Sequence, residues 1–393
     1  MPDASILVIN TGSSSLKLGL YVEREGQECL LFDGLADGIG RSSGTLTVRD
    51  AGGQVLRSEA LASTTQHEAL REAVKWLAQL SSGTPCAIGH RVVHGGPRLT
   101  THQRITPEVV EQLQQCVHFA PLHIPMALKL IEEAQSSYPQ TPEFACFDTA
   151  FHRTMPEAAY RFALPRELYD RGVRRYGFHG LSYESILYQL GDQLPERTVI
   201  AHLGSGASLA AVRDGRSVDT SMGLTPTGGI PMATRTGDLD PGVILYLLRQ
   251  ERATVDSVEA LLNHGSGLKA LSGGKGDVRD LEAAADAGDS EAQLALEVFC
   301  SRIGQTVAAY AAVLGGLDLL VFAGGIGEHS ARVRGTVCGG LGFLGVALDQ
   351  SGNQSHAATI SAPESKVRVR IVPSDEDRQI ARHCRALLQA ERG

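Results

Sequence analysis

Two arginines stand beside glycines, in surroundings that favour binding of a carboxylate or a phosphate. Arg91 lies in HRVVHGG at 90–96, and Arg235 lies in TRTGD at 234–238. An arginine among glycines at a strand end has few side chains to pack against, and its planar guanidinium matches the oxygens of both anions. The alternative for each is an ordinary surface salt bridge. Both arginines are therefore candidate anion ligands.

Three further residues could take part in chemistry, and each also has a structural explanation. Asp148 ends an apolar run, where a carboxylate could hold magnesium, act as a base towards an alcohol, or cap the helix that follows. His179 lies in YGFHG at 176–180 and is either catalytic or structural. Glu376 begins the last predicted helix, where the helix dipole favours a carboxylate without any further role.

Glycine is the unusual component of the chain. It accounts for 44 of 393 residues, about 11% against an average of about 7%. The glycine clusters lie at 10–15, 94–96, 202–208, 222–242 and 323–328. Consecutive backbone N–H groups in such turns can cradle an anion, although any one cluster can be an ordinary tight turn. Several clusters at strand ends in one chain favour a phosphorylated ligand.

Neither of two familiar phosphate-binding motifs applies. The chain has no G-x-x-x-x-G-K-[ST] segment, which excludes a P-loop enzyme. Residues 340–345 match G-x-G-x-x-G, but no convincing strand precedes them. We interpret this match as fortuitous.

Short apolar strands alternate with amphipathic helices, which predicts an α/β fold to position these residues. The expected strands are 4–9, 16–22, 87–93, 144–147, 198–203, 208–212, 319–323 and 367–372, the last alternating like an edge strand. The expected helices are 66–80, one that starts after the cap Thr106, 242–251, 255–263, 290–313 and a final helix capped by Ser374.

An internal repeat supports a duplicated architecture. The segment VINTGSSSL at 8–16 resembles IAHLGSGASL at 200–209. Each predicts a strand, a Gly/Ser turn and a return strand. Because the copies lie about half a chain apart, a duplicated domain is favoured over a chance match.

The composition argues against several classes of protein. Lys and Arg number 36 and Asp and Glu 44, a net charge of −8, so no basic face for a nucleic acid is expected. The seven cysteines are scattered without a C-x-x-C pair, which argues for a reducing compartment. No signal peptide is recognisable. The most apolar stretch, 307–327, contains Asp318 and a pair of glycines, which predicts a buried helix, a turn and a strand rather than a membrane span.

Taken together, the motifs resemble those of the bacterial acetate kinase family and the related short-chain carboxylate kinases. They occur in the family's order and cover essentially the whole chain. The matching segments are VINTGSSSLK at 8–17, GHRVVHGG at 89–96, FAPLH at 119–123, FDTAFH at 147–152, RRYGFHG at 174–180, DTSMGLTP at 219–226, TRTGDLDPG at 234–242, GDVRD at 276–280 and FAGGIGE at 322–328.

The resemblance implies a fold and an assembly. The expected fold is α/β, with duplicated ribonuclease H-like domains of the actin-like ATPase type and a nucleotide cleft between them. The first domain would comprise residues 1–149 with a C-terminal helix at about 374–393, and the second residues 150–373. A cytoplasmic homodimer is implied, with no membrane or nucleic-acid partner.

The resemblance also implies an activity, the reversible Mg²⁺-dependent transfer of the γ-phosphoryl group of ATP directly to acetate, giving acetyl phosphate and ADP. Arg91 and Arg235 match the arginines that hold the carboxylate and the transferring phosphoryl group. His179, supported by His123, matches the histidine that stabilises the transition state. Because a carboxylate is already a nucleophile, no catalytic base is needed, and catalysis rests on positioning and charge neutralisation.

Three further sets of residues acquire roles from the resemblance. The residues linked to the metal, Mg²⁺ or alternatively Mn²⁺, are Asn10, Glu376 and Asp148, of which Asp148 also counts as catalytic. The apolar pocket for the methyl group of the acid is expected from Val93, Leu122, Phe178 and Pro226. The residues at nucleotide-binding positions are Lys17, His202, Gly204, Ser205, Gly206, Asp277, Val278, Arg279, Gly325, Ile326 and His329.

Several positions depart from the family pattern, although no charged catalytic residue is lost. Ser205 and His329 replace asparagines in nucleotide-facing turns, so they bear on the preferred nucleotide. Ile124 replaces the Asn of PLHNP, next to His123. Tyr183 replaces the last residue of GFHGTSH.

Three alternatives stay open, and one of them, given the departures, is a catalytically silent homologue. A propionate kinase would act on an acid with one more methylene, worth only about 1–3 kcal/mol in such a pocket. An actin- or chaperone-like ATPase would hydrolyse ATP without stimulation by a carboxylate and would use a peptide or filament surface. The sequence shows no additional domain that would provide this surface.

Overall fold

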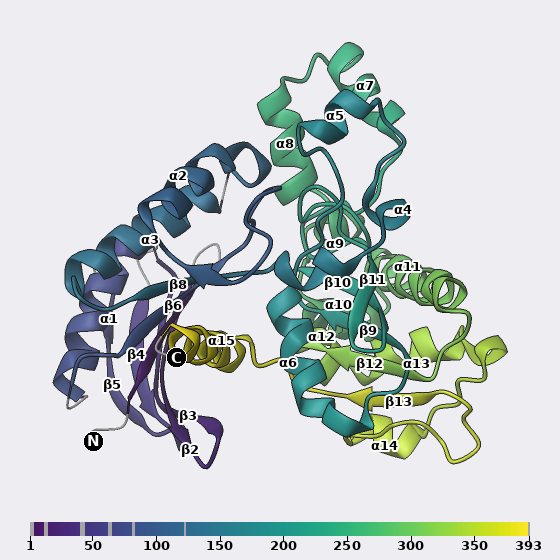
Figure 1. Ribbon diagram of the computed structural model, residues 1–393. Coiled ribbons are helices and arrows are strands. Elements are labelled where there is room, and N and C mark those ends of the chain that lie inside the picture. The colour runs from purple at the N-terminus through teal and green to yellow at the C-terminus, as the bar shows by residue number, and fades with distance from the viewer. Residues whose placement is uncertain are drawn as a thin grey trace. The chain divides into compact units, whose positions relative to one another are not determined.

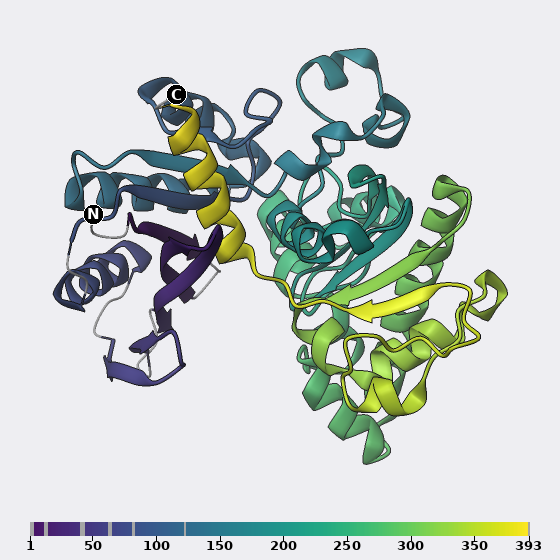
Figure 2. The ribbon, with the colours of Figure 1, turned by 60° about the horizontal axis from the view of Figure 1, so that its bottom comes forward.

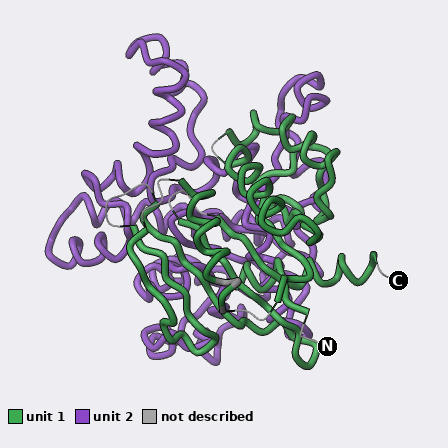
Figure 3. Tube along the Cα trace, turned by 90° about the vertical axis from the view of Figure 1, so that its left-hand side faces the viewer, with its two compact units in different colours: residues 1–150, 375–393 green, residues 151–374 purple. Residues whose placement is uncertain are grey.

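The chain is organised in two compact units, each built around its own sheet. The structure, a computed structural model, describes residues 4–11, 15–39, 44–61, 65–80, 83–121 and 123–391. Unit 1 comprises Met1–Ala150 and Asp375–Gly393, and unit 2 comprises Phe151–Ser374 (Figure 3).

Within its described residues, unit 1 contains an eight-stranded mixed sheet and four helices. Its strands are β1 (Ile6–Thr11), β2 (Ser15–Arg24), β3 (Gln27–Asp37), β4 (Thr45–Asp50), β5 (Val55–Ala60), β6 (Ala87–Val92), β7 (Gln103–Arg104) and β8 (Glu143–Phe147). Its helices are α1 (Gln66–Leu80), α2 (Pro107–Gln115), α3 (Ile124–Ser137) and α15 (Glu376–Ala390). The strand order is β5-β4-β3-β2-β1-β6-β8-β7.

The centre of this sheet is parallel. β1 pairs with β6 and β6 with β8 in parallel, whereas β1 to β5 form an antiparallel meander. Parallel strands end at the same edge of a sheet, so the residues that follow β1, β6 and β8 are brought together.

Helices cover both faces of the sheet in unit 1 (Figure 1). Leu7 and Ile9 of β1 share a buried core with α1 and α3. On the opposite face α15 packs against β1 and β6 (Figure 2). Gly89 permits this approach, because a Cβ there would lie 2.5 Å from both Cys384 Sγ and Ile380 Cγ2 of α15. The missing side chain thus helps to place the N-terminus of α15 at the edge where β6 ends.

Unit 2 contains a five-stranded mixed sheet in the order β11-β10-β9-β12-β13. Its strands are β9 (Arg197–Leu203), β10 (Ala207–Arg213), β11 (Arg216–Thr220), β12 (Leu319–Ala323) and β13 (Arg368–Ile371). Its helices are α4 (Glu157–Tyr160), α5 (Arg166–Asp170), α6 (Gly180–Leu190), α7 (Pro241–Arg249), α8 (Val255–His264), α9 (Gly267–Leu271), α10 (Val278–Asp286), α11 (Ser290–Leu314), α12 (Gly324–His329), α13 (Ala331–Gly339) and α14 (Gln350–Gln354). The 3₁₀ turns in the described part of the chain are η1 (Val117–Phe119), η2 (Ala150–Thr154), η3 (Gly191–Gln193) and η4 (Gly342–Leu344).

The sheet of unit 2 also lies between helices. Tyr183 and Ile186 of α6 join a buried core with Ile200 of β9 and Val321 of β12. On the other side α11 packs against β9 and β10 (Figure 1). β9, β12 and β13 are parallel, so their ends also meet at one edge.

Both sheets contain the same run of five strands. β3-β2-β1-β6-β8 in unit 1 corresponds to β11-β10-β9-β12-β13 in unit 2, with two antiparallel pairings followed by two parallel ones. The hairpins β1/β2 and β9/β10 are the segments whose sequences resemble each other. The predicted fold class, α/β with a duplicated ribonuclease H-like arrangement, is confirmed.

Most expected elements are present close to their predicted bounds. α1 has the predicted limits, and Thr106 caps α2 by accepting a hydrogen bond from the Val109 N–H. The predicted cap of the last helix was wrong: Asp375, not Ser374, is the N-cap, and its carboxylate accepts from the Arg378 N–H. The helix therefore begins at Glu376. The sequence analysis did not predict β3 to β5, β7, α3 to α6, α9, α10 or α12 to α14.

Three further predictions from the sequence agree with the structure. All seven cysteines lie in the described ranges and are free thiols. Residues 307–327 form the end of α11, a turn, β12 and the start of α12. No helix in the described part of the chain is long and apolar enough to cross a membrane. The G-x-G-x-x-G match at 340–345 follows α13 rather than a strand, so it was correctly set aside.

Candidate functional site

The carboxyl ends of β1, β6 and β8 bring three candidate residues together in unit 1. Ile9 of β1 is opposite His90 of β6, so Asn10 and Arg91 follow in neighbouring positions. Asp148 directly follows β8. Arg91 Nη1 donates a hydrogen bond of 3.2 Å to Asn10 Oδ1.

Arg91 and Asp148 form a two-pronged ion pair. Arg91 Nη2 donates to Asp148 Oδ2 at 2.8 Å, and Arg91 Nε donates to Oδ1 at 3.1 Å. The side chain of Asp148 is 1% exposed and that of Arg91 18%. Burial lowers the pKa of Arg91, but the carboxylates of Asp148 and Glu376 outweigh it and raise that pKa above its usual value. The guanidinium therefore stays charged, with its plane held by Asp148.

The N-terminus of α15 adds two carboxylates. Glu376 Oε2 lies 3.7 Å from Arg91 Nε, and Asp377 Oδ1 accepts a 2.5 Å hydrogen bond from Asn10 Nδ2. Burial raises the pKa of Asp377, the hydrogen bond from Asn10 lowers it, and the charge of Glu376 raises it again, so that the net shift is upward. Sequence reasoning missed Asp377, because it stands in an acidic run that a helix start explains by itself.

The donor atoms of this cluster suit a hard divalent cation. The carboxylates of Asp148, Glu376 and Asp377 and the amide of Asn10 offer oxygen ligands, which Mg²⁺ prefers. Arg91 already engages both oxygens of Asp148. A cation would therefore share Asp148 with Arg91.

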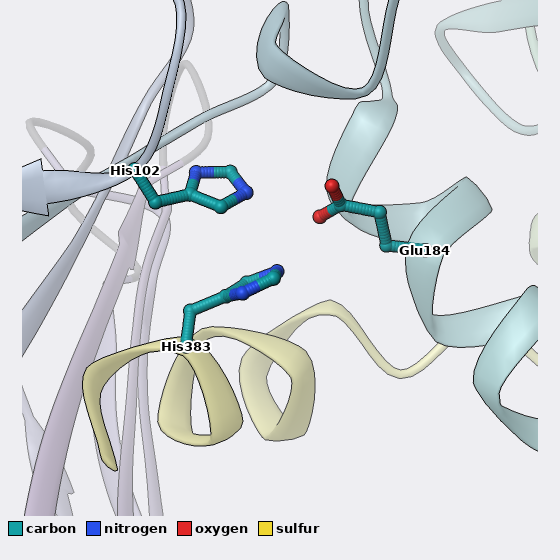
Figure 4. Close-up of side chains that lie close together, drawn as sticks. All are labelled: His102, Glu184 and His383. Carbon is teal, nitrogen blue, oxygen red and sulfur yellow. The ribbon is translucent and has the colours of Figure 1, made fainter. Parts of the chain in front are cut away.

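Two histidines of unit 1 that the sequence analysis did not single out lie in contact (Figure 4). The ring centroids of His102, which precedes β7, and His383 on α15 are 4.0 Å apart. His102 Nδ1 accepts a 3.0 Å hydrogen bond from the Phe147 N–H at the end of β8. The pair therefore links α15 to β8. Glu184, also drawn in Figure 4, belongs to α6 of unit 2.

In unit 2, His179 occupies an unusual backbone position at the N-cap of α6. Its φ of 58° lies in the left-handed region, which few non-glycine residues adopt. Its Nδ1 lies 2.8 Å from Ser208 Oγ of β10. Its ring stacks on His202 of β9, with centroids 4.4 Å apart. The imidazole is thus held at its face and at one ring nitrogen.

The segment before His179 is anchored by a buried histidine. His152 Nε2 lies 3.0 Å from the Phe178 carbonyl, and His152 Nδ1 lies 2.8 Å from Ser217 Oγ. Burial lowers the pKa of His152 to about 4. Because a carbonyl only accepts, Nε2 carries the proton and the neutral ring holds Phe178 in place.

Arg235 and His179 approach the same glycine turn. A Cβ on Gly206 would lie 3.4 Å from His179 Nε2 and 3.5 Å from Arg235 Nη1. Arg235 Nη1 also donates to the Pro226 carbonyl at 3.1 Å. Unit 2 therefore places an imidazole and a guanidinium around the turn between β9 and β10.

Two groups of predicted nucleotide-binding residues lie at one edge of the sheet in unit 2. Gly204, Ser205 and Gly206 form the turn after β9, and Gly325, Ile326 and His329 belong to α12, directly after β12. β9 and β12 are parallel neighbours, with Ala323 opposite His202. The residues that follow these two strands can therefore contact the same ligand.

The third group lies at the start of α10. Arg279 Nη2 donates to Asp277 Oδ2 at 2.6 Å, and Val278 between them is buried. A polar cavity of about 490 Å³ lies near α10 and α12, and its lining residues are Glu282, Asp286, His329, Ala331, Arg332, Gln354 and His356.

The remaining predicted residues are divided between the units. Those expected to line the apolar pocket are Val93 of unit 1, Phe178 and Pro226 of unit 2, and Leu122, which lies outside the described residues. Lys17 is exposed on β2, and His123 is the N-cap of α3.

Comparison with known proteins gives a consistent result. The model of the acetokinase family matches residues 5–382. An acetate kinase from Methylocella silvestris is 44% identical over 398 aligned positions, which cover 98% of either chain. The crystal structure of Porphyromonas gingivalis acetate kinase is 37% identical with a TM-score of 0.87. That of a propionate kinase from Francisella tularensis is 35% identical with a TM-score of 0.91. Both structures cover 98% of this chain and are themselves covered completely.

Proposed function

The chain belongs to the acetokinase family, and from this premise we propose that it transfers the γ-phosphoryl group of ATP reversibly to acetate, giving acetyl phosphate and ADP. The observation that carries the proposal is the similarity to an acetate kinase over 98% of the chain. The enzyme is thus a phosphotransferase with a carboxyl group as acceptor.

The reaction needs charge neutralisation more than acid–base chemistry. A carboxylate oxygen of acetate attacks the γ-phosphorus in line, and the bond from that phosphorus to the bridging oxygen of ADP breaks. The nucleophile carries no proton to remove, so Asp148 is not required as a base. Positioning and stabilisation of the equatorial oxygens dominate such a transfer.

We assign carboxylate binding to Arg91 in unit 1. Asp148 holds its guanidinium plane through Nε and Nη2, and the raised pKa keeps it charged. A preorganised cation loses little conformational freedom when an anion binds.

We assign stabilisation of the transferring phosphoryl group to Arg235 and His179. Both side chains flank Gly206, and the small turn between β9 and β10 leaves room beside them. The glycine turn and the start of α12 offer backbone N–H groups for the phosphates of the nucleotide. Asp277, Val278 and Arg279 would contact the rest of the nucleotide.

We propose that Asn10, Asp148 and Glu376 hold Mg²⁺, which Mn²⁺ could replace. The fit rests on their oxygen donors, which lie together at the ends of β1 and β8 and the start of α15. A bound divalent ion would neutralise charge on the phosphate oxygens. These residues would orient the ion, while Arg91 keeps Asp148 in place.

The choice between acetate and propionate is tested by a panel of acids. Similarity to a propionate kinase structure keeps propionate as the alternative. The initial rates with acetate, propionate and butyrate are measured with ATP, GTP and pyrophosphate as donors. The proposal predicts the highest kcat/KM for acetate with ATP. A clearly higher kcat/KM for propionate would establish the alternative, and ATP hydrolysis without carboxylate stimulation would favour a chaperone-like ATPase.

We further propose that the enzyme is a cytoplasmic homodimer. Large apolar side chains are exposed on α7 and α8, namely Val243, Leu245, Tyr246, Val255 and Leu261. Exposed apolar patches commonly mark protein interfaces. Light scattering of the purified protein tests the dimeric state. The double variant Tyr246→Glu with Leu245→Glu should be a monomer. A monomeric parent protein would refute it.

A further inference from the structure

We propose that Tyr183 and Ser208 form a hydrogen-bonded relay that sets the tautomer of His179, so that the neutral imidazole carries its proton on Nε2. The inference deepens the proposed function and rests on it for its catalytic meaning. Tyr183 and Ser208 are positioning residues, since they act through His179.

The relay is buried and its members come from two elements. Tyr183 lies four residues after His179 on α6, and its hydroxyl is 2.5 Å from Ser208 Oγ of β10. Ser208 Oγ is in turn 2.8 Å from His179 Nδ1. Tyr183 and Ser208 are fully buried, and His179 is 9% exposed. No bulk water is therefore expected between these groups.

The direction of the relay follows from counting protons. Burial raises the pKa of Tyr183, so its hydroxyl keeps its proton. In the described part of the chain, this hydroxyl has Ser208 Oγ as its one hydrogen-bond partner. A buried O–H group without an acceptor is costly, so Tyr183 donates to Ser208.

The remaining proton of the relay belongs to Ser208. Its hydroxyl accepts from Tyr183, and its own hydrogen has His179 Nδ1 as the available acceptor. A neutral imidazole has one accepting nitrogen and one donating nitrogen. Because Nδ1 accepts, Nε2 carries the hydrogen.

Nε2 is the nitrogen on the side of the proposed chemistry. It faces the turn at Gly206, where Arg235 Nη1 also lies. An Nε2–H group can donate to an equatorial oxygen of the transferring phosphoryl group, whereas a bare Nε2 would repel it.

The tautomer can be read by NMR without any assay of activity. Protein labelled with ¹⁵N in its histidines is compared with Tyr183→Phe and Ser208→Ala, and the His179 signals are assigned with His179→Gln. The proposal predicts a protonated Nε2 and an unprotonated Nδ1 in the parent protein near neutral pH. Both relay variants should shift towards a mixture of tautomers. A protonated Nδ1 in the parent, or unchanged shifts in both variants, would overturn the relay.

Kinetics then test its consequence. Tyr183→Phe and Ser208→Ala should lower kcat by about tenfold with little change of KM, because they alter the orientation and tautomer of a group that acts on the transition state. Tyr188→Phe, an exposed tyrosine on the same helix, is the matched control and should keep the parent kcat. Unchanged kcat in both relay variants would refute the positioning role. If the enzyme used no carboxylate substrate, the proposed function would fail while the NMR result would stand.

Discussion

Arg91 of β6 donates through Nε and Nη2 to both carboxylate oxygens of Asp148, the residue after β8. The two residues are 57 positions apart in the chain, yet parallel pairing of their strands places them at one sheet edge. Asp148 is buried to 1% exposure, so the pair serves both the fold and the proposed site. Removing Arg91 therefore has two consequences that must be measured separately.

Arg91→Ala should abolish most activity and also destabilise unit 1. Arg91 is assigned to binding of the carboxylate, so its loss leaves the nucleophile misplaced, which can cost on the order of 10²-fold in rate. The unpaired buried carboxylate of Asp148 costs about 3–5 kcal/mol. The rate of acetate phosphorylation measures the first effect, and urea unfolding of the same variant measures the second. Arg104→Ala, which removes an exposed pair with Glu391, is the control and should cost less than about 1 kcal/mol. Parent-like activity in Arg91→Ala would contradict the assignment.

Arg235→Ala should lose activity with little loss of stability. Arg235 is half-buried, in contrast to the buried Asp148 that Arg91 holds, and its Nη1 donates to the Pro226 carbonyl. We expect kcat/KM to fall by on the order of 10³-fold. Arg213→Ala is the matched control, because Arg213 also donates to a backbone carbonyl, that of Val313, away from the proposed site. Equal rates in the two variants would remove Arg235 from the mechanism.

His152 should make the stability of unit 2 depend on pH. Its pKa falls from 6.5 to about 4 through burial, so the unfolded chain binds the proton more tightly. The stabilisation is complete above pH 6.5 and is lost as pH falls through 4, a change of roughly 3 kcal/mol. The stability difference between the parent and His152→Gln should shrink as pH falls across this window.

Urea unfolding at several pH values measures this difference. His264→Gln, at an exposed histidine of unit 2, is the control. Its free energy of unfolding should stay close to that of the parent protein. If the difference in unfolding free energy between the parent and His152→Gln stayed constant between pH 7 and pH 4.5, the role of His152 would be refuted.

Gly89→Ala should destabilise unit 1 by about 1–3 kcal/mol, the usual cost of overpacking. The added Cβ would meet Cys384 Sγ and Ile380 Cγ2 at 2.5 Å and push α15 from the sheet. Gly34→Ala in β3 is the control, because its Cβ would lie 3.5 Å from the nearest atom, Leu18 Cβ. Urea unfolding compares the two, and adding Cys384→Ala to Gly89→Ala should recover part of the loss. Equal losses of stability in Gly89→Ala and Gly34→Ala would show that the packing of α15 does not depend on the close approach at Gly89.

Glu376→Gln should raise the Mg²⁺ concentration needed for half-maximal rate, on the order of tenfold. The change removes one negative charge 3.7 Å from Arg91 while keeping the shape of the side chain. Chelation with EDTA should stop the parent enzyme, and added Mn²⁺ should restore it. Glu391→Gln, at an exposed acid after α15, is the control. An unaltered Mg²⁺ dependence in Glu376→Gln would exclude it from the metal site.

The sequence by itself determined the local structure and the candidate residues. Thr106 and Pro107 specify a helix start through capping and a fixed φ, because such preferences act between neighbours. The motifs also determined the family, since arginine, histidine and glycine recur in them at fixed spacing.

Other parts of the fold could not be predicted from local pattern. β4 and β5 lack a continuous apolar run of strand length, and β5 is largely exposed. α6 is buried on most of its surface, so it shows no simple amphipathic period. Ser374 and Asp375 are both good caps, and only the observed helix start distinguishes them.

The tertiary structure alone decided which candidates are partners. Asn10 bonds to Asp377 across 367 residues, and Arg91 reaches Glu376 at the other end of the chain, because α15 returns to the sheet at Gly89. Tyr183 of α6 and Ser208 of β10 become hydrogen-bond partners only when the two elements pack together. Neither pairing leaves a signal in local sequence, since long-range contacts depend on strand order and helix packing rather than on neighbouring residues.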